Sequence, residues 1–104
     1  MIFNLRDRLA GKAVFSKAEL SLILGLYGDH VKKGIWKDYA IDSLPDMAVF
    51  SVYKSARENP VYAIAKLPAR GLLKPSRFSV FSGNKTLLEN ASLADVLAFF
   101  AEEK

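Results

Sequence analysis

Residues 48–67 read AVFSVYKSARENPVYAIAKL and contain two runs of alternating side chains with a polar connection between them. In the first run, Ala48, Phe50 and Val52 share one face of a strand, because successive side chains of a strand point to opposite sides. In the second run, an aromatic and a branched side chain alternate with alanines in the same way. The stretch therefore predicts two neighbouring strands of an antiparallel sheet.

Three further strand candidates lie outward from this pair, at residues 39–41, 78–81 and 86–88. Between the last two, Gly83 and Asn84 form the centre of a tight turn, since both residue types tolerate a positive φ angle. All five candidates follow one another along the chain without an intervening helical pattern. They predict a meander of four to five antiparallel strands.

Two amphipathic helices are predicted on either side of the strands. Ser16 is expected to cap the first helix, and Glu19 stands three residues later, where it completes a capping box. Gly34 is placed to end that helix in a left-handed conformation. Ser92 and Asp95 repeat the capping spacing at the start of the second helix. The predicted fold class is α+β, with the two helices packed on one face of the meander.

The chain of 104 residues is 51% hydrophobic, which is enough for one core at a common domain size. We expect residues 15–104 to form this single α+β domain. Residues 1–14 show no clear period, and they are predicted to be a partly ordered N-terminal arm.

The buried face of the first helix is predicted from the spacing of its apolar residues. This stripe comprises Leu20, Ile23, Leu24, Tyr27 and Val31. Ser21, Gly25 and Gly28 fall on a common flank of the same helix. Because each Gly costs a helix about 1 kcal/mol relative to Ala, this flank indicates a close approach by another backbone. That backbone belongs either to a strand of the same domain or to a partner helix.

Two single residues have specific expectations. His30 is the one histidine, and at the edge of the apolar stripe it is predicted to be partly exposed. Trp36 follows the end of the helix and is predicted to be a buried anchor, with ligand stacking as the alternative.

Composition points to a setting without disulfides or membrane spans. The chain contains no Cys, which excludes disulfides, thiolate nucleophiles and cysteine metal sites. No segment approaches the roughly 20 apolar residues that span a bilayer, and charged residues occupy the start where a signal peptide needs an apolar core. We expect a cytoplasmic protein with no membrane contact.

No catalytic, cofactor or metal site is predicted. The sequence lacks phosphate-loop and dinucleotide-binding fingerprints and the nucleophile elbow of hydrolases. One histidine without cysteines does not build a zinc site. Asp38, Asp42 and Asp46 recur every four residues, but that spacing does not bring side chains together in a strand and turn. We therefore predict that the protein is not an enzyme and binds no cofactor.

Charge is distributed unevenly along the chain. Residues 54–85 carry seven basic residues and one acidic residue, whereas residues 86–104 carry four acidic residues and one basic residue. Such a split indicates an anionic partner, or else strand ends decorated with cations for solubility. The candidate binding surface consists of Tyr53, Lys54, Lys66, Arg70, Lys74 and Arg77.

The segments W-x-D-Y-x-I at residues 36–41 and A-V-F-S-V at residues 48–52 also carry a resemblance. Through them, residues 15–68 resemble a family of short alphaproteobacterial proteins, a domain of unknown function. The resemblance implies a cytoplasmic bacterial protein and transfers no catalytic residue.

These observations predict a non-enzymatic binding or regulatory module that acts through contacts with a protein partner. The predicted surface is the uncovered sheet face together with the loop at residues 70–74. The alternative is nucleic-acid binding by the basic residues 54–85, since aromatic side chains beside cations suit single strands.

Overall fold

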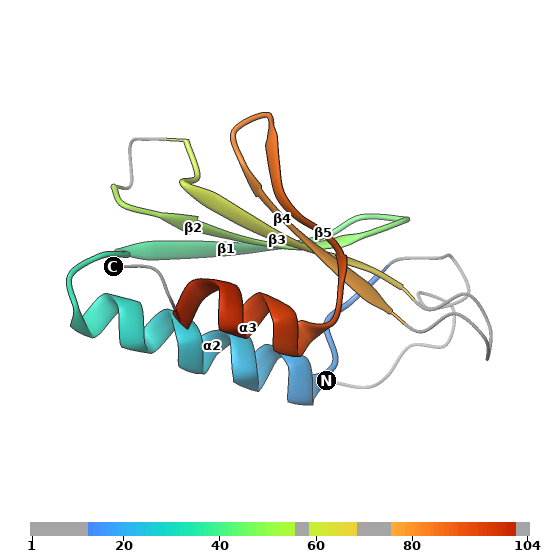
Figure 1. Ribbon diagram of the computed structural model, residues 1–104, viewed down its shortest axis with the longest axis horizontal. Coiled ribbons are helices and arrows are strands. Elements are labelled where there is room, and N and C mark those ends of the chain that lie inside the picture. The colour runs from blue at the N-terminus through green and yellow to red at the C-terminus, as the bar shows by residue number, and fades with distance from the viewer. Residues whose placement is uncertain (1–12, 56–58, 69–75, 102–104) are drawn as a thin grey trace.

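The computed structural model describes residues 13–55, 59–68 and 76–101. Helix α2 (Lys17–Lys32) is followed by strands β1 (Asp38–Ser43), β2 (Ala48–Tyr53), β3 (Tyr62–Leu67), β4 (Arg77–Ser82) and β5 (Lys85–Ala91), and then by helix α3 (Leu93–Ala101). The five strands form one antiparallel sheet in the order β1-β2-β3-β4-β5. Both helices pack on the same side of this sheet (Figure 1). The predicted α+β meander is confirmed.

The start and end of α2 follow the predicted chemistry. The Ser16 hydroxyl accepts a hydrogen bond from the Glu19 backbone N–H at 3.1 Å, and the Glu19 carboxylate accepts one from the Ser16 N–H at 2.7 Å. These reciprocal bonds satisfy two donors that a helix N-terminus otherwise leaves unpaired. Beyond the other end, Gly34 has a φ of 74°, the left-handed conformation expected for it.

Helix α3 begins with the same device. The Ser92 hydroxyl accepts a hydrogen bond from the Asp95 N–H at 3.1 Å, and the Asp95 carboxylate accepts one from the Ser92 N–H at 3.2 Å.

At the turn before β5, Gly83 has a φ of 62°, so the glycine provides the positive angle that a tight hairpin requires. The predicted hairpin between β4 and β5 is confirmed.

The core lies between the sheet and the two helices. Its buried side chains are Ile23, Trp36, Phe50, Val52, Ile64, Phe78, Val80, Val96 and Phe100. Trp36 is 1% exposed and contacts Phe100 edge-on, with ring centroids 5.3 Å apart. The expectation that Trp36 is a buried anchor is confirmed.

The prediction for His30 is wrong, because this residue is 3% exposed. Its ring stacks on Trp36 at a centroid distance of 4.0 Å, and its Nδ1 lies 3.0 Å from the Leu26 carbonyl oxygen. His30 follows Ile23 by seven residues, which is nearly two full turns, so both residues lie at the centre of the buried face. Val31, which we assigned to the buried stripe, is 41% exposed.

The close approach predicted for the glycines of α2 is also wrong within the domain. A Cβ atom added at Gly25 or Gly28 would meet no described atom within 4 Å. These glycines lie on the side of α2 opposite Ile23 and His30, as the helical period requires. A strand of the same domain therefore does not explain them.

Candidate binding surface

The sheet has one side packed against the helices, the helix side, and a second side that we call the open face. Tyr27 of α2 contacts Phe50 and Tyr39, and Glu19 contacts Lys66, which assigns these strand residues to the helix side. Alternation along each strand then assigns the intervening residues to the open face. Across β1 to β4 these are Asp38, Ala40, Asp42, Val49, Ser51, Tyr53, Ala63, Ala65, Leu67, Arg77, Ser79 and Phe81.

Small side chains occupy the centre of the open face. The register joins Ala40, Ser51 and Ala63 across three strands, and Ala63 lies opposite Phe81 on the fourth. The centre is therefore lined by small side chains, and larger ones such as Tyr53 and Phe81 lie around it. No helix of the described residues covers this face (Figure 1).

The candidate site residues do not all share that face. Tyr53 is half-buried on the open face, and Lys54 is exposed directly after β2. Arg77 lies on the open face at the start of β4, where its Nε donates to the Asn90 side-chain oxygen at 3.1 Å. Arg70 and Lys74 lie outside the described residues.

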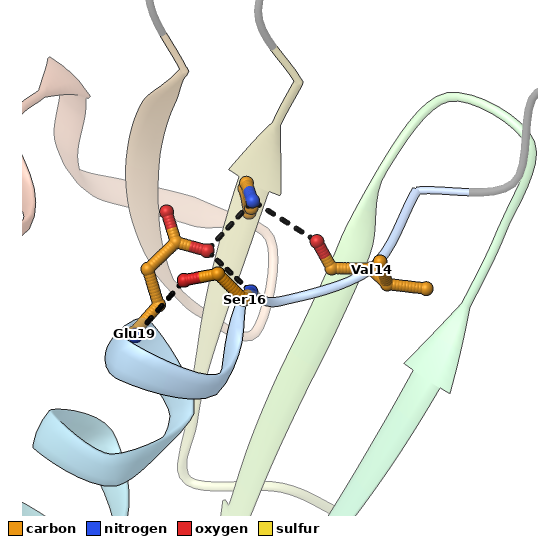
Figure 2. A network of polar contacts seen from close by, with 4 residues as sticks. Val14, Ser16 and Glu19 are labelled. Atoms are coloured by element: carbon orange, nitrogen blue, oxygen red, sulfur yellow. Dashed lines mark hydrogen bonds and ion pairs between the residues drawn. The ribbon is translucent and has the colours of Figure 1, made fainter. Parts of the chain in front are cut away.

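Lys66 is on the helix side and is only 9% exposed. Its Nζ lies 2.6 Å from a Glu19 carboxylate oxygen and donates to the Val14 carbonyl at 3.0 Å. Figure 2 shows how Val14, Ser16 and Glu19 converge at the start of α2 to form this polar network. Lys66 therefore links the N-terminus of α2 to β3, although Lys66 and Glu19 are 47 residues apart in the sequence.

The Glu19 carboxylate has an altered acidity in this network. Burial alone would raise the pKa of Glu19, but the hydrogen bond from Lys66 and those from Ser16 outweigh burial. They hold the pKa of Glu19 below its ordinary value of 4.5. The carboxylate is thus charged at neutral pH and pairs with the Lys66 ammonium group.

Sequence reasoning missed this pair, although a signal for it was present. Lys66 shares its strand parity with Tyr62 and Ile64, which both lie on the helix side. A lysine at such a position needs an anionic partner, because an unpaired buried charge is very costly. The capping Glu19 was the acid available at the helix start.

The described residues contain neither a cluster of metal ligands nor a membrane-spanning helix. Within residues 13–55, 59–68 and 76–101, no three His, Asp or Glu side chains are grouped closely enough to hold a metal ion. No helix in the same ranges is long and apolar enough to cross a membrane.

Comparison with known proteins adds a family assignment. Residues 13–97 match the model of a family described as "Protein of unknown function (DUF2794)". The chain belongs to this family. No curated protein and no solved structure matched the chain. The DUF2794 match confirms the resemblance to a domain of unknown function, whereas the alphaproteobacterial origin stays a prediction.

Proposed function

We propose that this DUF2794 protein is a non-enzymatic binding or regulatory module that contacts a protein partner through the open face. One observation carries the proposal. An antiparallel sheet packed on one side ordinarily has polar residues on its other side. Among the open-face positions of β2, β3 and β4, however, Arg77 has the only charged side chain.

The accessible part of the open face is formed by its larger side chains. Ser51, Ala65 and Ser79 are only 7%, 3% and 4% exposed, so half-buried neighbours such as Val49 and Phe81 are the side chains that a partner can reach. Apolar patches on soluble proteins commonly mark interaction sites. Tyr53 and Phe81 at the margin add aromatic contacts, which are enriched at protein interfaces.

The alternative proposal, nucleic-acid binding by residues 54–85, requires several cations on one exposed face. Lys54 and Arg77 lie at opposite ends of the sheet, since Lys54 follows Tyr53 and Arg77 pairs with Leu67 beyond Lys66. The Lys66 ammonium group is engaged with Glu19 on the helix side. Protein contact is therefore the function that we favour. The proposal includes a bacterial and cytoplasmic setting, which rests on the sequence resemblance.

The test is recovery of bound molecules from native cell extract on the immobilised protein, with and without nuclease and across a salt series. A nuclease-resistant protein that the Val49→Lys and Ala63→Lys variants no longer recover would support the proposal. Leu22→Lys is the matched control, because Leu22 is an apolar residue 52% exposed on α2. Recovery of nucleic acid that declines steeply with salt would support the alternative instead.

A further inference from the structure

Among the strands of the described residues, β1 forms an edge of the sheet, since it pairs with β2 on one side and is the first in the sheet order. The Leu44 N–H donates to the Met47 carbonyl at 2.8 Å where the hairpin closes. Backbone groups of an antiparallel strand alternate between its two sides. The backbone N–H and C=O groups of Asp38, Ala40 and Asp42 therefore point toward β2.

The residues between them direct their backbone groups away from the sheet. The Tyr39 N–H agrees with this assignment, because it donates to its neighbour's carboxylate, Asp38 Oδ1, at 2.8 Å. Ile41 and Ser43 follow at the same parity. Apart from the Tyr39 N–H, which Asp38 already accepts, the edge thus presents outward backbone donors and acceptors, which are the template for adding another strand.

The side chains of β1 include two large apolar ones on its helix side and two acids on its open-face side. On the helix side, Tyr39 and Ile41 are 40% and 42% exposed although both are large and apolar. Tyr39 extends the core outward, since it contacts Tyr27 of α2 at a ring-centroid distance of 4.8 Å. On the open-face side, Asp38 and Asp42 are both exposed acids.

We infer that the β1 edge binds an extended segment of a partner protein that adds as a sixth strand and has Lys or Arg at alternate positions. Charge complementarity selects this occupant. The basic side chains would lie beside Asp38 and Asp42, and the intervening apolar side chains would cover Tyr39 and Ile41. The backbone supplies the affinity, and the acids supply the preference for a basic sequence.

A second copy of this chain fits the edge less well. Antiparallel pairing of β1 with itself brings Asp38 and Asp42 of both copies together on one face, where like charges oppose pairing. Exposed charges at an edge also serve to prevent strand addition altogether. The experiment distinguishes these three outcomes.

The experiment titrates the isotope-labelled full chain with a capped peptide in which Lys and Val alternate, and follows every backbone amide by NMR. We expect the Ile41 and Ser43 amides to shift and to become protected from hydrogen exchange. A peptide in which Glu replaces Lys should bind about tenfold more weakly, as two lost ion pairs and two repulsions imply.

Variants locate the site and test its chemistry. Asp38→Asn with Asp42→Asn should weaken binding of the Lys peptide about tenfold. Asp29→Asn, which neutralises an exposed acid on α2, is the control and should leave binding unchanged. Ile41→Pro removes an outward N–H without removing a bond to β2, so it should abolish binding while Trp36 fluorescence still reports a folded core.

Three results would overturn the inference. The first is no binding by the Lys peptide, which would make the acids a protection of the edge. The second is equal binding of the Lys and Glu peptides, or shifts confined to the open face. The third is a dimer in sedimentation experiments that Ile41→Pro dissociates, which would make a second copy the occupant. The open face has a separate test in Ala63→Lys, because Ala63 pairs with Ser51 and Phe81 and not with a residue of β1.

Discussion

The helix side and the open face of the same sheet differ in the size of their side chains. On the helix side, Phe50, Ile64 and Phe78 fill the space beneath α2 and α3. On the open face, the residues adjacent in sequence to Phe50 and Ile64 are Ser51, Ala63 and Ala65, together with Val49. Because burial of large apolar side chains provides most of the folding free energy, the helix side should account for stability. The open face is then left for contacts with a partner.

The largest expected effect is on the helix side, at Phe50. This residue is fully buried, and its ring stacks on Tyr39 at a centroid distance of 5.0 Å. Phe50→Ala should lower the free energy of unfolding by about 3–5 kcal/mol, from lost transfer energy and the cavity that remains. Urea unfolding followed by Trp36 fluorescence measures this loss, and a loss below about 1 kcal/mol would contradict the assignment of Phe50 to the core.

A matched pair on one strand tests the comparison directly. Val52 on the helix side is 1% exposed, whereas Val49 on the open face is half-buried. Val52→Ala should cost about 2–3 kcal/mol and Val49→Ala less than about 1 kcal/mol, although both changes remove the same atoms. The same urea titration gives both values. Equal losses would mean that the two faces contribute alike to stability.

The polar network at Lys66 sharpens the comparison, because it is a charged contact on the side that is otherwise apolar. Glu19→Gln should lower the free energy of unfolding by roughly 1–2 kcal/mol at neutral pH, since the Lys66 ammonium group then lacks its anion. Ser16→Ala serves as the control, because it alters the helix cap while leaving the ion pair.

The same pair gives stability a defined pH dependence. The pKa of Glu19 is lower in the folded protein than its ordinary value of 4.5. The resulting stabilisation is therefore fully present above pH 4.5, and it is lost as the pH falls through the lower folded value. In Glu19→Gln this part of the pH profile should disappear. An unchanged profile between the two proteins would contradict the pairing.

The smallest expected effect lies on the outer side of α2, a third surface. Because no described atom lies within 4 Å of a Cβ at Gly25, Gly25→Ala should stabilise the protein by about 1 kcal/mol through helix propensity alone. Thermal unfolding measures the gain. If Gly25→Ala instead leaves stability unchanged and removes a bound partner, the partner-helix alternative for this flank gains support.

Much of the fold follows from local chemistry. The caps at Ser16 and Ser92 and the left-handed Gly34 follow from residue types at fixed spacing, and alternation along β2 correctly separates Phe50 from Ser51. Such features depend on neighbours in sequence. They were therefore predicted from the sequence and confirmed.

The remaining features depend on contacts between distant segments. The burial of His30 depends on Trp36 and Phe100 lying across the core, and the place of Lys66 depends on Glu19, which is 47 residues away. The number of basic residues in 54–85 does not reveal that the Lys66 side chain lies on the helix side. The proposed surface at the open face rests on sheet order, which brings Ala40, Ser51 and Ala63 side by side.

The most direct test of the division between the two faces measures stability and partner recovery on one variant. The protein with both Val49→Lys and Ala63→Lys should stay folded and lose no more than about 2 kcal/mol of stability, because both positions are half-buried and a lysine there can extend its ammonium group to water. It should nevertheless fail to recover the nuclease-resistant partner that the Leu22→Lys control still recovers. Recovery of that partner by the double variant, at undiminished yield, would contradict our account of the open face.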